Sequence, residues 1–293
     1  MQTNDRTPIR VTVWGENYHE RHDESVQKLY PEGMHGALAA GISKQLGSAV
    51  EVRWVTMDMP EHGLTEEVLA STDVLTWWGH WVHQDVDDAI VDRVQQAVLA
   101  GMGLIVLHSG HHSKIFRKLM GTTCNLRWRG GTNREHVWTV NPTHPIAQGV
   151  PNPIVLPSHE MYGEFFDIPT PDDLIFISAF DGGEAFRGGC TFRRSHGKIF
   201  YFSPGDQEYP IYHNDDVLKV IANAVEWVAP ALPQRGAPPV VWKKGKGYAD
   251  QLEEGSLDDA LAMAERHGLE VINQSERQVT LRGAGGFVTS VEL

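Results

Sequence analysis

The chain has 293 residues, of which 41% are hydrophobic and 22% charged, and it carries a formal net charge of −13 at pH 7. This acidic balance disfavours a nucleic-acid partner or an anionic membrane surface, because both need a positive face. Two cysteines, Cys124 and Cys190, give no disulfide framework. Residues 1–7 are polar, and no apolar stretch approaches the roughly 20 residues of a membrane span. We therefore expect a cytoplasmic protein.

The first half of the chain alternates between strand and helix patterns. Runs of β-branched and apolar residues predict strands over 9–14, 50–56, 73–78 and 104–107. Apolar residues at helical spacing predict helices over 34–46, 64–70, 85–100 and 113–120. This alternation is typical of a mainly parallel, doubly wound α/β sheet with right-handed crossovers.

The middle of the chain has more strands and more prolines. Strands are predicted over 126–129 and 136–140, and the prolines between 151 and 171 indicate a loop-rich insertion. Short turns make the strands predicted over 174–179 and 189–193 antiparallel. A strand over 198–203 then returns to the sheet before an amphipathic helix over 215–228. We expect a β-rich insertion in an otherwise parallel fold.

A proline-rich stretch over 230–239 predicts a domain boundary. The expected main domain covers 1–230. The remainder, 231–293, is expected to be a linker followed by a small αβ appendage, with a helix over 257–267 and strands over 270–272, 278–281 and 287–289.

Polar residues follow the carboxyl ends of several strands. In a sheet of flavodoxin-like order, the first, third and fourth strands are neighbours, and ligands bind at that edge. The residues placed there, or brought there by the insertion and the late strand, are Glu16, His19, His80, His83, His108, His159, Glu160, Asp206 and His213.

Two kinds of chemistry fit this set. Neutral imidazoles bind a divalent metal such as zinc, for which His19, His80 and His108 are the candidate ligands. Alternatively, His108, Glu160 and Asp206 exchange protons with a substrate. For either carboxylate alone, a structural role in a loop or turn is equally consistent with the sequence, and no compact metal motif is present.

Tryptophans are abundant near the same edge of the sheet. Trp77 and Trp78 lie within a predicted strand and are expected in the core, whereas Trp81 follows the strand end. An indole beside carboxylates suits a carbohydrate, which packs its ring face on the aromatic plane. The candidate substrate-binding residues are Trp14, Glu16, Trp81, His159 and His213.

Several motifs in order resemble one family. They are residues 11–14 with the His-rich loop that follows, Gly103 to Gly110, the His-Pro-Ile turn at 144–146, Glu160-x-Tyr162, and residues 197–201. Over about residues 9–230 the chain resembles the ThuA-like (trehalose utilisation) proteins of the class I glutamine amidotransferase-like fold. That resemblance implies a role in sugar catabolism, beside an oxidoreductase that makes 3-keto sugars.

The chain departs from true amidotransferases at the residues that carry their chemistry. His108 stands where the nucleophilic cysteine would be, and Gly205-Asp206-Gln207-Glu208 replaces the partner His-x-Glu pair. Glutamine hydrolysis by that route needs the thiol and its base, so we do not expect an amidotransferase. Ser109 is a substitute nucleophile one position away.

The expected function is therefore that of an enzyme acting on a sugar or 3-keto-sugar, as an isomerase, lyase or hydrolase, with metal assistance as an option. The alternative is a non-catalytic sugar-binding or regulatory partner of a sugar oxidoreductase. The small C-terminal appendage suggests packing on a neighbouring subunit and hence a homo-oligomer.

Overall fold

The chain forms two compact units, Met1–Ala237 and Pro238–Leu293, and each is described by itself. The computed structural model describes residues 7–230, 257–275, 278–282 and 288–292. Apart from Pro230, the predicted linker over 230–239 lies outside these residues, as do positions 1–6. Within the described ranges, no helix has the length and apolar character needed to cross a membrane.

The parallel half of the sheet has the predicted flavodoxin-like order, β2-β1-β3-β4-β9. Its strands are β1 (Ile9–Gly15), β2 (Val50–Thr56), β3 (Val74–Trp78), β4 (Gly103–Leu107) and β9 (Gly197–Phe202). Every residue of β3 and β4 is buried, because helices cover both faces of the sheet here. These strands confirm the ones predicted from apolar runs.

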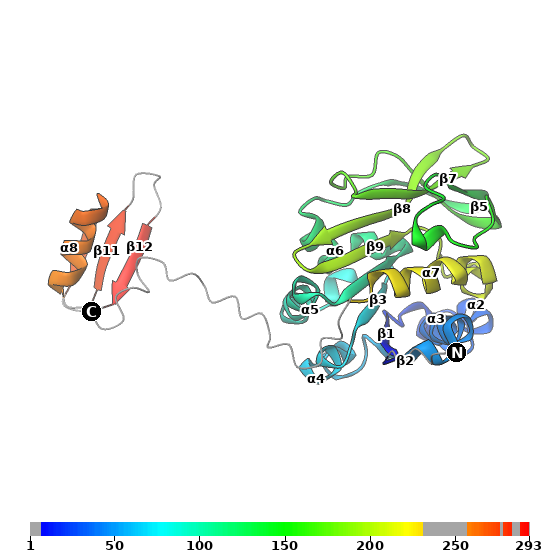
Figure 1. Ribbon diagram of the computed structural model, residues 1–293, viewed down its shortest axis with the longest axis horizontal. Coiled ribbons are helices and arrows are strands. Elements are labelled where there is room, and N and C mark those ends of the chain that lie inside the picture. Colours follow the sequence, from blue (N-terminus) through cyan, green and yellow to red (C-terminus); the bar gives the residue numbers. More distant parts are fainter. Residues whose placement is uncertain (1–6, 231–256, 276–277, 283–287, 293) are drawn as a thin grey trace, which may run out of the picture. The chain divides into compact units, whose positions relative to one another are not determined.

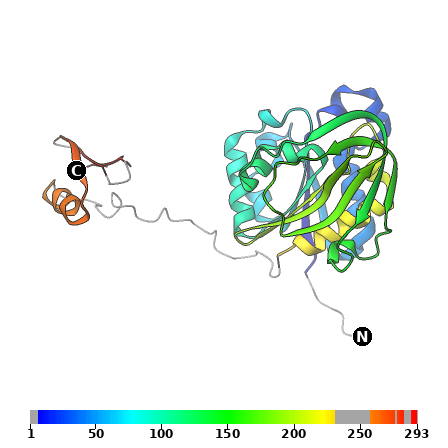
Figure 2. The same ribbon diagram turned by 90° about the horizontal axis from the view of Figure 1, so that it is seen from above.

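Helices pack on both faces of this sheet (Figures 1 and 2). On one face lie α3 (Gly33–Leu46) and α7 (Asp215–Val228), and on the other α4 (Glu66–Ala70), α5 (Asp88–Ala100) and α6 (Lys114–Met120). Each was predicted to within a few residues. Thr65 caps α4 by accepting the N–H of Val68, as its position before the helix suggests.

The antiparallel half continues the same sheet and corrects two predictions. Its strands are β5 (Arg127–Thr139), β6 (Ile154–Gly163), β7 (Asp173–Phe180) and β8 (Ala185–Arg194), in the order β9-β8-β7-β5-β6. A single β5 stands where two strands were predicted, and β6 stands where a loop-rich insertion was predicted. Prolines caused the second error: Pro157 is tolerated because β6 is an edge strand, with one side free of ladder bonds.

This half of the sheet also curls. β6 and β8 contact each other although β7 and β5 stand between them in the sheet order. The curl is visible in the green strands of Figure 2. It brings the distal strand β6 back toward the parallel half.

The polar segment after β1 forms two helices that were not predicted, α1 (His19–His22) and α2 (Glu24–Leu29). Asp23 caps α2 by accepting the N–H of Ser25. Single 3₁₀ turns complete the described part of this unit: η1 (Gly47–Ala49), η2 (Pro60–Gly63), η3 (His83–Asp85), η4 (His108–His112), η5 (Pro145–Ala147) and η6 (Ile211–His213).

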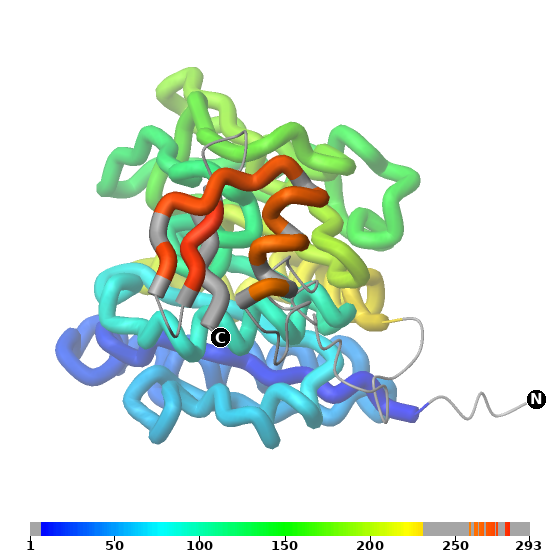
Figure 3. The backbone as a smooth tube through the Cα atoms, turned by 90° about the vertical axis from the view of Figure 1, so that its left-hand side faces the viewer, coloured from blue at the N-terminus to red at the C-terminus, as the bar shows by residue number. Residues whose placement is uncertain are grey.

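The described residues of the C-terminal unit form one helix beside three antiparallel strands (Figure 3). They are α8 (Leu257–His267), β10 (Glu270–Ser275), β11 (Gln278–Arg282) and β12 (Val288–Glu292). α8 contacts β10 and β11, and Ala264, Val279 and Leu281 are buried. The predicted helix is confirmed, and the strands are longer than predicted.

Candidate functional site

The chain turns sharply at His108, directly after β4. His108 has φ +48°, a left-handed conformation that is uncommon for any residue except glycine. The turn continues into η4 and then into α6, whose first N–H groups are capped by Ser113. This elbow is the position at which the resemblance placed an amidotransferase nucleophile, and here an imidazole occupies it.

Three side chains from three different parts of the sheet meet at this elbow. Nε2 of His108 lies 3.2 Å from Oε2 of Glu160 and 3.5 Å from Oδ2 of Asp206. Glu160 comes from β6, and Asp206 follows β9. The structure therefore brings together the three residues that were predicted to exchange protons. We call this set the central trio.

The His108 ring is held on every side. Its Nδ1 lies 2.8 Å from the carbonyl oxygen of Ser203, so this nitrogen carries a proton and donates it. The ring stacks on Tyr162 at 4.7 Å, and the Tyr162 hydroxyl lies 3.2 Å from Nε2. Glu160 and Tyr162 are two apart on β6, so they project from the same face. The imidazole therefore has one orientation, with Nε2 toward the carboxylates.

The charges of the trio are strongly coupled. Burial alone lowers the pKa of His108, but Asp206 and Glu160 outweigh it and raise the pKa to about 10. Burial raises the pKa of Asp206, but the interaction with His108 outweighs it and lowers the pKa to about 2. Asp206 is therefore an anion throughout the neutral range.

A buried pair supports the loop that carries Asp206. Nδ1 of His159 lies 2.6 Å from Oε2 of Glu135, and both side chains are almost fully buried. Nε2 of His159 accepts the N–H groups of Gly205 and Asp206 at 3.1 and 3.2 Å. His159 was predicted to bind substrate; instead, both its nitrogens hold the protein's own groups, and it positions the Asp206 loop.

The side chain of Glu16 likewise forms hydrogen bonds with the protein backbone. Its carboxylate accepts the N–H groups of His80, Trp81 and Val82 at 2.8 to 3.1 Å. Burial raises the pKa of Glu16, although these hydrogen bonds lower it. Glu16 was predicted to bind substrate, but it fixes the loop after β3 and so sets where His80 and Trp81 lie.

A cavity of about 650 Å³ opens above the trio. It is lined by five histidines (His19, His80, His83, His111, His112), the carboxylates Asp23, Glu160, Asp206 and Glu208, and the indoles of Trp81 and Trp128. Burial lowers the pKa of His80 to about 4 and that of His83 to about 3. These two imidazoles are neutral at pH 7. The His108 side chain itself is fully buried and lies behind the two carboxylates.

The predicted metal ligands are close but do not form one tight group. The ring centroids of His19 and His80 are 5.1 Å apart, and those of His80 and His108 6.1 Å. Among the described residues, the group whose ligand atoms all lie within 4.8 Å of one another is His108, Glu160 and Asp206. Of the predicted ligands, His108 alone belongs to it.

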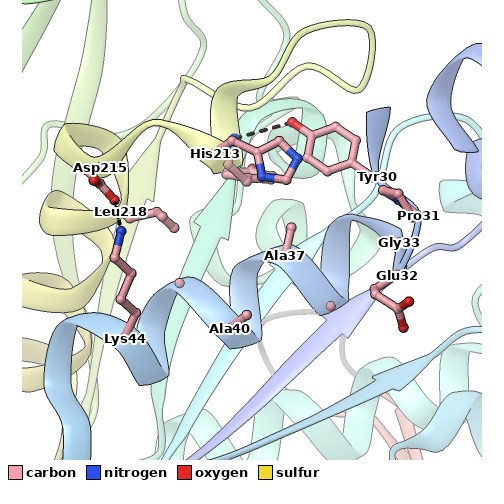
Figure 4. A pocket seen from close by; sticks show the side chains of 13 residues that line it. Tyr30, Pro31, Glu32, Gly33, Ala37, Ala40, Lys44, His213, Asp215 and Leu218 are labelled. Carbon is pink, nitrogen blue, oxygen red and sulfur yellow. Dashed lines mark hydrogen bonds and ion pairs between the residues drawn. The ribbon is translucent and has the colours of Figure 1, made fainter. Parts of the chain in front are cut away.

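Two predicted substrate-binding residues lie elsewhere. Trp14 is 1% exposed, stacks on Trp77 at 4.0 Å, and donates its indole N–H to the carbonyl of His62. It belongs to the core. His213 stacks on Tyr30 and lines a separate pocket of about 380 Å³ between α3 and α7 (Figure 4). The alternative nucleophile Ser109 donates its hydroxyl to the carbonyl of Gly79.

Sequence reasoning missed Trp128 and Glu135. Trp128 is 67% exposed and pairs across the strands with Tyr162, which places both on the same face of the sheet beside the trio. The sequence did contain a signal for β6, the strand that pairs with Trp128, because Glu160-x-Tyr162 has the two-residue period of a strand. The prolines in this stretch obscured the signal, since they made β6 resemble a loop.

The fold and part of the sequence match known proteins. The family model described as ThuA, trehalose utilisation, matches residues 10–228. No curated protein matches the chain by sequence. A ThuA-like protein from Parabacteroides merdae ATCC 43184 has 14% identity and a TM-score of 0.56, over 76% of this chain and 90% of that one. A ThuA-like protein from Bacteroides uniformis ATCC 8492 has 16% identity and a TM-score of 0.51, over 76% and 92%. At these identities the likeness shows the fold alone, and the predicted flavodoxin-like order of the parallel sheet is confirmed.

Proposed function

The chain belongs to the trehalose utilisation (ThuA) family, and we propose that it is an enzyme that acts on a sugar or 3-keto-sugar by proton transfer. The observation that carries this proposal is the pair of carboxylates, Glu160 and Asp206, at the floor of a cavity with exposed indoles on its wall. Sugar rings pack on indole faces, and their hydroxyls bind polar groups such as the surrounding imidazoles.

The reaction follows from the acidity of a keto-sugar. The carboxylate of Glu160 takes a proton from the carbon next to the carbonyl, and the C–H electron pair moves to the carbonyl oxygen. The positive charge of the His108 imidazolium stabilises the negative charge of the resulting enediolate. If the proton of the adjacent hydroxyl moves to the former carbonyl oxygen, return of the carbon proton from Glu160 to the former carbonyl carbon gives an isomer. If instead the substituent on the next carbon leaves with the bonding electrons and takes the proton held by Glu160, the result is elimination. Asp206 stays ionised and balances the charge.

We expect Glu160→Gln to lower the rate of proton transfer by about a hundredfold or more. The measurement is exchange of the proton next to the carbonyl with D₂O, followed by NMR on a panel of 3-keto-sugars. Glu208→Gln is the matched control, because Glu208 is a carboxylate in the same cavity but outside the trio. If wild-type protein binds sugars but exchanges no proton and turns none over, the non-catalytic alternative replaces this proposal.

A second prediction concerns the indoles. Trp81→Ala and Trp128→Ala are each expected to raise KM by about tenfold, with kcat retained, because they remove apolar area that packs on the sugar ring but not on the reacting atoms. Trp138→Ala is the control: Trp138 is also on β5 and 44% exposed, but it does not line the cavity. An equal effect in all three variants would count against a sugar platform.

A further inference from the structure

We infer that the central trio is a site for a divalent cation such as Zn²⁺ or Mn²⁺, with Nε2 of His108, Oε2 of Glu160 and Oδ2 of Asp206 as ligands. The three atoms lie within 4.8 Å of one another, with 3.2 and 3.5 Å between the nitrogen and the two oxygens. Ligand atoms about 2.0–2.1 Å from a tetrahedral zinc are about 3.3 Å apart. The two nitrogen–oxygen distances are thus those of neighbouring ligands around one ion.

The same distances fit a direct ion pair less well. Hydrogen bonds between a charged nitrogen and a carboxylate are about 2.7–2.9 Å long. The pair of Arg187 and Glu164 reaches that length at 2.9 Å, whereas the buried pair of His35 and Glu20 stands at 3.8 Å. In the trio both carboxylates stand further off than in the pair of Arg187 and Glu164, although all three side chains are well buried. A cation shared between them accounts for this separation.

Two of the three ligands, His108 and Asp206, are oriented by neighbours, as metal ligands usually are. His108 donates from Nδ1 to the carbonyl of Ser203, so an ion would bind at Nε2 in place of the proton on that nitrogen, which binding releases. Asp206 accepts the N–H of Glu208 with Oδ1 at 2.7 Å, which leaves Oδ2 toward His108. The pair of Glu135 and His159 fixes the backbone beneath Asp206.

A second observation points to a missing group in the same cavity. Among the described residues, Nδ1 of His80 and Nε2 of His19 are buried without a hydrogen-bond partner, and both side chains line the cavity. Buried polar atoms left unpaired need a water or an ion as partner. Water molecules bound to a cation at the trio supply such partners. Of the three predicted metal ligands, His108 is therefore retained. His19 and His80 become neighbours of the ion, and Glu160 and Asp206 replace them as ligands.

For the role of the ion, this inference rests on the proposed function. A bound cation would polarise the substrate's carbonyl oxygen, while the second oxygen of Glu160 remains available for the proton. The binding of the ion can be tested without any sugar.

The experiment titrates chelator-treated, full-length protein with Zn²⁺ by calorimetry and records the visible spectrum after adding Co²⁺. We expect one ion per chain, and a loss of affinity of at least about tenfold in Asp206→Asn. Glu208→Gln and His112→Ala, which alter the same cavity outside the trio, are expected to bind as wild type does. In thermal unfolding, Zn²⁺ should raise the Tm of the wild type but not that of Asp206→Asn.

Two results would overturn the inference. One is the absence of stoichiometric binding in the wild type. The other is binding that Asp206→Asn and Glu208→Gln weaken equally. Full proton exchange by chelator-treated protein would instead remove the catalytic role of the ion, while leaving its binding and the proposed function intact. Conversely, tight binding in a protein that turns over no sugar would leave the ion site and remove the proposed function.

Discussion

His108→Asn is expected to lower turnover of the sugar by about 10³- to 10⁴-fold while leaving a folded protein. His108 contacts both carboxylates and, with φ +48°, forms the elbow after β4. Asparagine adopts this backbone conformation more readily than most residues, so the elbow is retained. Its short amide places no group at the position of Nε2, and Glu160 and Asp206 lose the partner that orients them.

The measurements are D₂O exchange for activity, with circular dichroism and thermal unfolding for the fold. Ser109→Ala is the adjacent control. Because Ser109 donates its hydroxyl to the carbonyl of Gly79, we expect this variant to keep most of its turnover. If His108→Asn stays active, His108 has no part in the reaction. If Ser109→Ala is folded but inactive, the Ser109 hydroxyl, named above as a substitute nucleophile, takes part in it.

The parallel half of the fold could be predicted because its information is local. β3 and β4 are short apolar runs between glycines or polar turns, and the helices between them show one apolar face. β6 could not be predicted because Pro157 is compatible with a strand only at a sheet edge. Whether a strand lies at an edge depends on the order of all the strands, which local pattern does not contain.

The candidate site, like the fold, could be predicted only in part from local sequence pattern. That His108 and Asp206 meet follows from the carboxyl ends of β4 and β9 lying at one sheet edge, and this much was predicted. Glu160 was expected from a loop-rich insertion, whereas it comes from β6. Which polar residues face the cavity was not predictable for Glu16 and His159. Both are buried, and their partners are backbone N–H groups from distant loops. Residue type alone does not distinguish a side chain that binds a ligand from one that binds the protein's own backbone.

Glu135→Ala is expected to lower the free energy of unfolding by about 1–3 kcal/mol, because removing the carboxylate leaves the buried Nδ1–H of His159 without a hydrogen-bond acceptor. Glu135 and His159 are 0% and 1% exposed, and their nearest atoms are 2.6 Å apart. Without Glu135, Nδ1 of His159 has no acceptor, and the ring that holds the N–H groups of Gly205 and Asp206 becomes free to rotate. Activity should therefore fall together with stability.

Urea unfolding measures this change, and Glu184→Ala is the control, because Glu184 forms its ion pair with Arg129 at the surface and exposed pairs contribute little. A double-mutant cycle with His159→Ala separates the pair from the cavity that each truncation creates. If Glu135 acts through His159, the second substitution costs much less in the Glu135→Ala background than in the wild type. Additive losses would mean that Glu135 stabilises the sheet independently and that the Asp206 loop is held by His159 alone.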